Sequence, residues 1–207
     1  VIDGLKGAKQ VALVTNTINS PSTLRAIEEF KAAYPVTHVS YDAVSYSGIL
    51  DAHQKAFGKR ILPAIDFSKG DVIVSFGADF LGNWFNHTLA SKQFAQSRKL
   101  SNGKKTMSRL YAYEANLSLT GANADYRQPI KPSEELALLQ ALYKGLDGGS
   151  SAYKGEAGKM LTKTIKDLRK AQSSIVISGS NDVDVQSLII AINEKLGNYN
   201  TAIDVSR

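Results

Sequence analysis

The sequence contains no cysteine and only three histidines among its 207 residues. Without cysteine, the chain can form no disulfide, thiolate nucleophile, cysteine-ligated zinc site or iron–sulfur cluster of its own. The histidines, His38, His53 and His87, stand at spacings that match no metal motif, and the sequence shows no serine or carboxylate partner for them. We therefore expect neither a metal site nor a catalytic residue in this segment.

Long apolar runs are also missing. No stretch approaches the roughly 18 consecutive apolar residues that a membrane span needs, so we expect no direct membrane insertion. The chain begins at Val1 instead of methionine. This start predicts a piece of a larger polypeptide, whose targeting signal would lie elsewhere.

Strong charge clustering is absent, although the formal net charge is +6. The lysines and arginines are scattered along the chain, which is typical of a solvated surface and does not predict a nucleic-acid partner. A hydrophobic fraction of 43% is ordinary for a globular protein. The length and composition together predict one domain over residues 1–207.

Short apolar segments alternate with segments of helical spacing. Strands are expected at 10–15, 36–41, 71–76, 105–113, 174–178 and 201–205, and helices at 22–34, 48–57, within 81–97, from 133 to about 143, at 156–170 and at 183–196. Ser22 and Ser133 are the expected N-caps, and Gly197 the expected C-terminal stop. This alternation predicts an α/β fold: a doubly wound, mainly parallel, Rossmann-like sheet with helices on both faces. The strand order stays open.

Three turns that follow expected strands are rich in small and polar residues, at 15–17, 77–82 and 178–182. In an open parallel sheet ligands bind beyond the carboxyl ends of the strands, and turns of this kind suit phosphates. The chain has neither a G-x-G-x-x-G motif after the first strand nor a Walker loop, so the turns are equally interpretable as plain connections.

Individual side chains in this region have two interpretations each. Asp79 is a candidate acid or ribose ligand, or else a cap of the next helix. Asp125 and Arg127 either pair to fix a loop, or Arg127 holds an anion. The aromatic residues around Trp84 either line a groove or belong to the core or to an interface; they are Phe80, Trp84, Phe85 and Phe94.

Three segments carry a resemblance to a known family. DVIVSFGAD at 71–79, ADYRQPIKPSEE at 124–135 and the stretch 174–204 with INEKLG resemble, in the same order, segments of molybdopterin oxidoreductases of the dimethyl-sulfoxide-reductase and formate-dehydrogenase superfamily. In that family the first strand end contacts the pterin cofactor. The resemblance marks vestigial cofactor-binding candidates at Gly77, Ala78, Asp79, Gly121, Asn123, Asp125, Arg127, Ser178 and Gly179.

The sequence most resembles one branch of this superfamily, the molybdopterin-like domain of the iron–sulfur subunit of bacterial alternative complex III. VTNTINSPST, GADFLGNW and LSLTGANADYRQPIKPSEE carry this likeness. It implies a cofactor-free scaffold domain of a respiratory, quinol-oxidising electron-transfer complex. Iron–sulfur clusters would lie elsewhere in the parent chain, and the partners would be other domains and subunits. The location would be peripheral, at the periplasmic face of the inner membrane.

The sequence departs from an active molybdoenzyme in ways that fit a lost cofactor. It lacks the cluster and molybdenum-ligating cysteines, Phe80 occupies a turn that would face the pterin, and Ser133 replaces a family glycine. One alternative is the pterin-binding domain of an active molybdopterin oxidoreductase. The other is a generic nucleotide or sugar-phosphate binding module.

Overall fold

A computed structural model describes residues 2–100, 105–148 and 153–206. The chain divides into two compact units, Val1–Ser45 and Tyr46–Arg207, where the sequence led us to expect one domain. The start at Val1, which suggested a longer polypeptide, lies outside the described residues.

Unit 1 is a βαβ unit. It consists of α1 (Ile2–Lys6), β1 (Val11–Thr15), α2 (Pro21–Ala33) and β2 (Val36–Ser40), with β1 and β2 paired in parallel. The N-cap of α2 is Ser20, whose hydroxyl accepts the Thr23 N–H, so the prediction of Ser22 as the cap was wrong. Pro21 explains the shift, because proline at the first helical position leaves the cap to the residue before it.

Unit 2 carries the main sheet, which contains four parallel strands in the order β6-β5-β4-β7. Its elements are α3 (Ser47–Phe57), β3 (Ala64–Ile65), η1 (Phe67–Lys69), β4 (Val72–Phe76), α4 (His87–Arg98), β5 (Arg109–Glu114), α5 (Leu119–Ala122), β6 (Tyr126–Pro129), η2 (Pro132–Glu134), α6 (Glu135–Leu146), α7 (Gly155–Leu168), β7 (Ser174–Ser178), α8 (Val183–Lys195), η3 (Asn198–Asn200) and β8 (Ile203–Asp204). The predicted α/β, Rossmann-like class is confirmed.

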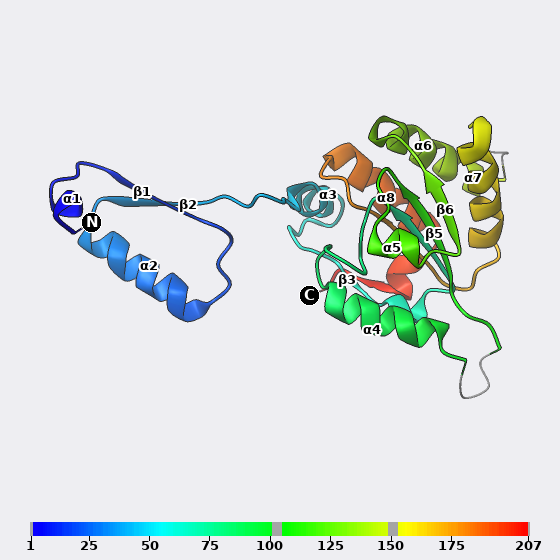
Figure 1. Cartoon of the computed structure of the whole chain (residues 1–207), viewed down its shortest axis with the longest axis horizontal. Coiled ribbons are helices and arrows are strands. Elements are labelled where there is room, and N and C mark those ends of the chain that lie inside the picture. The colour runs from blue at the N-terminus through cyan, green and yellow to red at the C-terminus, as the bar shows by residue number, and fades with distance from the viewer. Residues whose placement is uncertain (1, 101–104, 149–152, 207) are drawn as a thin grey trace. The chain divides into compact units, whose positions relative to one another are not determined.

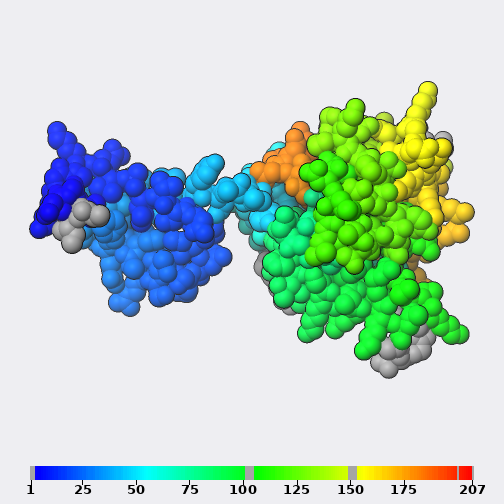
Figure 2. Space-filling model, in the orientation of Figure 1, coloured from blue at the N-terminus to red at the C-terminus, as the bar shows by residue number. Residues whose placement is uncertain are grey.

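Alternation of side chains across the central strand β4 divides the core between the two faces of the sheet. Val72, Val74 and Phe76 pack with β5 and with α6, α7 and α8. Ile73 packs on the opposite face with α4 and with the aromatic segment before it. In Figure 1, α6 and α7 lie on one side of the sheet and α4 on the other. The green middle of the chain, which carries α4, α5 and α6, contributes much of the visible surface of unit 2 (Figure 2).

Several predicted boundaries and caps were wrong. Ser133 does not cap a helix, because 132–134 form the 3₁₀ turn η2, in which the Glu134 carboxylate accepts the Lys131 N–H at 2.8 Å. The last strand is only Ile203–Asp204 and pairs antiparallel with β3 outside the main sheet. The strand β6 lies in a segment that looked like a polar loop, because its half-buried side chains pack only against elements distant in sequence, β5 and α7. Gly197 does end α8, with a φ of 71°.

The outer edge of β7 is closed by a side chain. In this sheet β7 pairs only with β4, so the N–H and C=O of Val176 point away from any strand. The buried carboxamide of Asn193 in α8 accepts from Val176 N at 3.1 Å and donates to Val176 O at 2.7 Å. It thus pairs with the strand as a neighbouring backbone would, and blocks further strand addition.

We predict that Asn193→Ala destabilises unit 2 by about 3 kcal/mol, because it leaves the buried N–H and C=O of Val176 without partners. Denaturant unfolding followed by the fluorescence of Trp84, the single tryptophan, would measure this. Asn123→Ala is the matched control, since the exposed Asn123 amide bonds only Leu119 O and its loss should cost less than about 0.5 kcal/mol. Equal destabilisation by the two variants would contradict the role of Asn193.

Candidate functional site

A cleft of about 570 Å³ lies at the carboxyl edge of the sheet, where β4, β5 and β6 end. We call it the strand-end cleft. Its lining comes from the turn after β4, the segment from β5 into α5, and the start of α6: Gly77, Asp79, Asn83, residues 113–119, Ile130, Pro132 and Glu135. The position is the one that an open α/β sheet offers to ligands.

The order of the strands explains why the cleft forms there. From β4 the chain moves outward to β5 and β6, and then returns across the sheet to β7 on the other side of β4. The direction of winding reverses at β4, so the connections leave the sheet on opposite faces. The turns after β4 and β7 meet at this point: the Gly179 N–H donates to Phe76 O at 2.8 Å, and a Cβ on Gly179 would lie 2.4 Å from Gly77 O.

Asp79 ties two turns at the cleft together. Its Oδ1 accepts hydrogen bonds from the N–H of Thr120 at 2.9 Å and from the Thr120 hydroxyl at 2.8 Å. Thr120 Oγ1 in turn accepts the N–H of Leu81 at 3.0 Å. Asp79 therefore bonds the first turn of α5. One interpretation of the sequence made it the cap of the next helix, but the N-cap of α4 is Asn86.

Glu114 ends β5 with its side chain almost fully buried. Its Oε1 accepts from Arg127 Nε at 2.6 Å and from Ser118 N at 3.2 Å, and its Oε2 accepts from the Ser118 hydroxyl at 2.5 Å. The predicted pair of Asp125 with Arg127 is thus wrong. Arg127 lies within β6 and bonds Glu114 of the neighbouring strand, whereas Asp125 precedes β6 and bonds Arg98 of α4.

Asp125 lies at the other edge of the sheet, before β6 begins. It forms a bidentate ion pair with Arg98, at 2.7 and 2.9 Å, and accepts the Leu110 N–H at 2.8 Å. Burial acts to raise the pKa of Asp125, but the bonds from Arg98 and Leu110 outweigh it and hold the pKa below its ordinary value. This side chain joins α4 to the sheet and takes no part in the cleft.

Glu135 is the third acid of the cleft and opens α6. The Ser178 hydroxyl donates to its Oε1 at 2.5 Å, and the same hydroxyl oxygen accepts the N–H of Ser180 at 2.9 Å. Burial raises the pKa of the Glu135 carboxyl above its ordinary value, and the bond from Ser178 only partly opposes this. Ser178, a predicted candidate, thus acts here by holding Glu135.

The remaining predicted residues divide between the cleft wall and other places. Ala78 is buried beneath the turn, and Gly121 packs so closely on Glu114 that a Cβ would meet its carboxylate. Asn123 lies on the surface, and its amide donates to the carbonyl of Leu119, the first residue of α5. The polar turn at 15–17 belongs to unit 1 and lines no part of the cleft.

The aromatic residues near Trp84 belong to the core. Phe80, Trp84 and Phe94 are buried, and Phe80 stacks on Phe67 with ring centroids 4.4 Å apart. The expectation that Phe80 would face a cofactor is wrong, because its side chain points into the core between the sheet and α4.

Sequence reasoning missed Glu114 and Glu135 as site residues. Glu114 was hidden because the end of β5 was predicted one residue too early, and a carboxylate at a strand end is the signal that would have revealed it. Glu135 lies in the first turn of an expected helix, where the helix dipole favours acidic residues in general, so nothing local set it apart. Its neighbour Ser178 comes from a strand 43 residues away, a contact that no local pattern contains.

No arrangement suited to a metal ion occurs in residues 2–100, 105–148 and 153–206, where no three histidine or acidic side chains gather for one. In the same residues no helix has the length and apolar character needed to cross a bilayer. The expected absence of a cofactor and the periplasmic location stay predictions.

No family model and no curated protein matches the chain. Among solved structures, the chain is similar to the formyltransferase/hydrolase complex from Methylorubrum extorquens, determined with methylofuran, with 17% identity and a TM-score of 0.59. The match covers 94% of this chain and 52% of the solved chain, so this chain spans about half the length of its structural neighbour. At this identity the likeness establishes the fold alone.

This comparison contradicts the assignment to the molybdopterin oxidoreductases, because the structural neighbour is a formyltransferase/hydrolase complex. The scaffold role in a respiratory quinol-oxidising complex and the role in an active molybdoenzyme were expectations from that assignment, and they are wrong with it. The resemblance misled because an apolar strand before a glycine turn, and a helix ending in glycine, are common to Rossmann-like domains in general.

We predict that Glu135→Gln stabilises unit 2 increasingly as the pH rises from about 4 to 8. A carboxyl with a raised folded-state pKa contributes its full stability below the unfolded pKa, and loses it as the pH passes the folded pKa. Glutamine keeps an acceptor for Ser178 and carries no charge, so the gain should approach about 1 kcal/mol at pH 8.

Chemical unfolding at several pH values, read from Trp84 fluorescence, would give this difference. Glu156→Gln is the control, since Glu156 is 75% exposed in its side chain and its pair with Lys159 contributes little. A Glu135→Gln gain that is the same at every pH would show that ionisation of Glu135 is not the cause.

Proposed function

We propose that unit 2 is a small-molecule-binding domain that takes a cationic, amine-bearing ligand in the strand-end cleft. One observation carries the proposal: three carboxylates from three elements line the cleft, and none of its lining residues is lysine, arginine or histidine. In a chain whose formal net charge is +6, an acidic cleft is a local exception to the surface around it.

The charge balance favours an ammonium group. Glu114 already pairs with Arg127, which leaves Asp79 and Glu135 as the carboxylates without a basic partner among the described residues. A cation near Glu135 would recover the cost that burial imposes on its ionised form. Phosphate, which the small turns first suggested, would meet like charge here and is disfavoured.

The size and walls of the cleft fit a compact organic molecule. Its volume of about 570 Å³ falls within the usual range for small-ligand sites. Tyr113 and Ile130 form apolar walls near the sheet, and Leu117 and Leu119 lie exposed at its border. A ligand with an apolar body and one amine would use both kinds of surface.

We also propose that the domain works beside other subunits, since its structural neighbour comes from a multi-subunit complex. Mass measurement of the native assembly purified from cells would test this. A particle with the mass of this polypeptide alone would contradict it.

The ligand proposal predicts that benzylamine raises the unfolding temperature of the chain, while benzyl alcohol and benzoate, which match it in shape, raise it less or not at all. The reason is that only the amine offers a positive charge to Asp79 and Glu135. Asp79→Asn should weaken benzylamine binding about tenfold in calorimetry, and added salt should weaken it further in the wild type.

Asp184→Asn, a change in the first turn of α8 that lines no part of the cleft, is the matched control and should leave the affinity unchanged. The proposal fails if benzoate binds as well as benzylamine, or if Asp184→Asn and Asp79→Asn have equal effects.

A further inference from the structure

Two large apolar side chains lie exposed at the border of the strand-end cleft. Leu117 and Leu119 both line it, and they are 68% and 54% exposed. Single exposed leucines are common on protein surfaces. This pair differs because both side chains border one cavity, with one residue between them. They form an apolar surface that a molecule bound in the cleft can cover.

The residue between the two leucines explains why they stay exposed. Ser118 has extended backbone, with φ −95° and ψ 173°. Its hydroxyl donates to the buried Glu114 carboxylate at 2.5 Å and accepts the Gly121 N–H at 3.0 Å. Neighbouring side chains in extended backbone point to opposite sides, so Leu117 and Leu119 face away from Glu114. The buried bonds of Ser118 thus hold both leucines on the outside.

The acidic and the apolar parts of the cleft meet at the start of α5. The N–H of Thr120, which the peptide bond joins to Leu119, donates to Asp79 Oδ1 at 2.9 Å. The second oxygen, Asp79 Oδ2, accepts no hydrogen bond from the described residues. An ammonium group bound at Asp79 would therefore lie next to the backbone that carries Leu119.

The described lining of the cleft offers no open aromatic face. Tyr113 is the aromatic residue among it, and its ring stacks on Phe76 with centroids 4.6 Å apart. Its hydroxyl forms a hydrogen bond with Thr164 at 2.7 Å, and the residue is fully buried. A ligand ring would find no aromatic side chain to stack on, whereas an aliphatic chain would find the two leucines.

We propose that the strand-end cleft selects a primary amine on an unbranched aliphatic chain. The ammonium group lies at Asp79, and the chain leaves the cleft over Leu119 and Leu117. The inference rests on the amine-binding function proposed above and names the class of amine. Each added methylene covers more of the two leucines and removes more apolar surface from water.

A series of straight-chain amines tests the inference by calorimetry on the full 207-residue chain, at one pH and one salt concentration. From propylamine to hexylamine, the dissociation constant should fall about two- to fourfold with each methylene. Hexylamine should also bind more tightly than benzylamine, although benzylamine has one carbon more, because its flat ring cannot follow the leucines.

The double variant Leu117→Ser and Leu119→Ser should reduce the gain to less than about 1.5-fold per methylene. Propylamine should keep its affinity to within about twofold, because the carboxylates are unchanged and its chain is too short to cover the leucines. Both side chains are exposed, so the double variant should fold.

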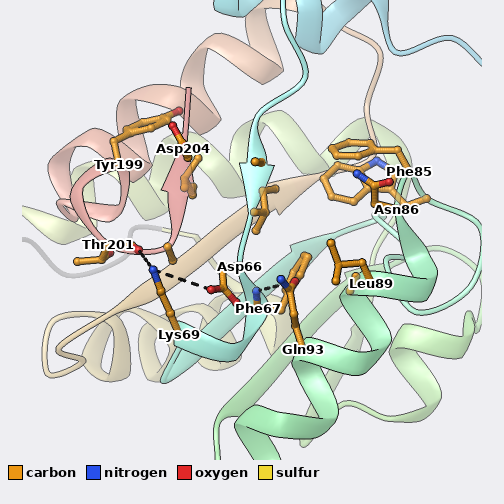
Figure 3. A pocket seen from close by; sticks show the side chains of 16 residues that line it. Asp66, Phe67, Lys69, Phe85, Asn86, Leu89, Gln93, Tyr199, Thr201 and Asp204 are labelled. Carbon is orange, nitrogen blue, oxygen red and sulfur yellow. Dashed lines mark hydrogen bonds and ion pairs between the residues drawn. The ribbon is translucent and has the colours of Figure 1, made fainter. Parts of the chain in front are cut away.

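Leu89→Ser is the matched control, since Leu89 is 51% exposed and borders a different cavity of unit 2 (Figure 3). That cavity encloses about 400 Å³ and shares no lining residue with the strand-end cleft. The control should keep the wild-type gain per methylene.

Amine binding that does not strengthen with chain length would overturn the inference and leave the amine site standing. The same would follow if the double variant kept the wild-type gain, or if benzylamine bound more tightly than hexylamine. If no amine of the series bound to the wild type, the proposed function would fail together with the inference.

Discussion

The parallel pairing of β4 with β5 on one side and β7 on the other is the constraint on which unit 2 depends. All five residues of β4 are buried, so the strand can exist only with neighbours on both edges and helices on both faces. The chain must reverse its winding direction there, and this reversal opens the strand-end cleft. Asn193 then stops the sheet from extending beyond β7 by bonding the free backbone of Val176.

Ion pairs at the two edges of the sheet have different consequences. At the amino edge Arg98 and Asp125 satisfy each other in a bidentate pair that joins α4 to β5 and β6, and little charge remains for a ligand. At the carboxyl edge Arg127 balances only Glu114, so Asp79 and Glu135 leave the cleft acidic. The same kinds of side chain therefore neutralise each other at one edge and leave negative charge at the other.

The strand-end cleft is open and charged, and its selectivity would come from the sign of the ligand charge. The family resemblance suggested a single vestigial pterin surface. It misled because similar strand-end motifs form the turns of Rossmann-like domains that bind different ligands.

The sequence by itself determined the α/β class and the positions of β1, β4, β7, α3 and α8 to within a residue or two, because apolar period and helix-ending glycine are local signals. Only the tertiary structure decided that 1–45 form a separate unit, that β6 joins the sheet, and that Asp125 pairs with Arg98 instead of Arg127. It also decided that the strand-end turns are acidic, since Glu114 and Glu135 reach them from separate elements. Apolar periodicity shows which face of an element is buried, but not which distant element packs on it, so these partners could not be predicted from the sequence.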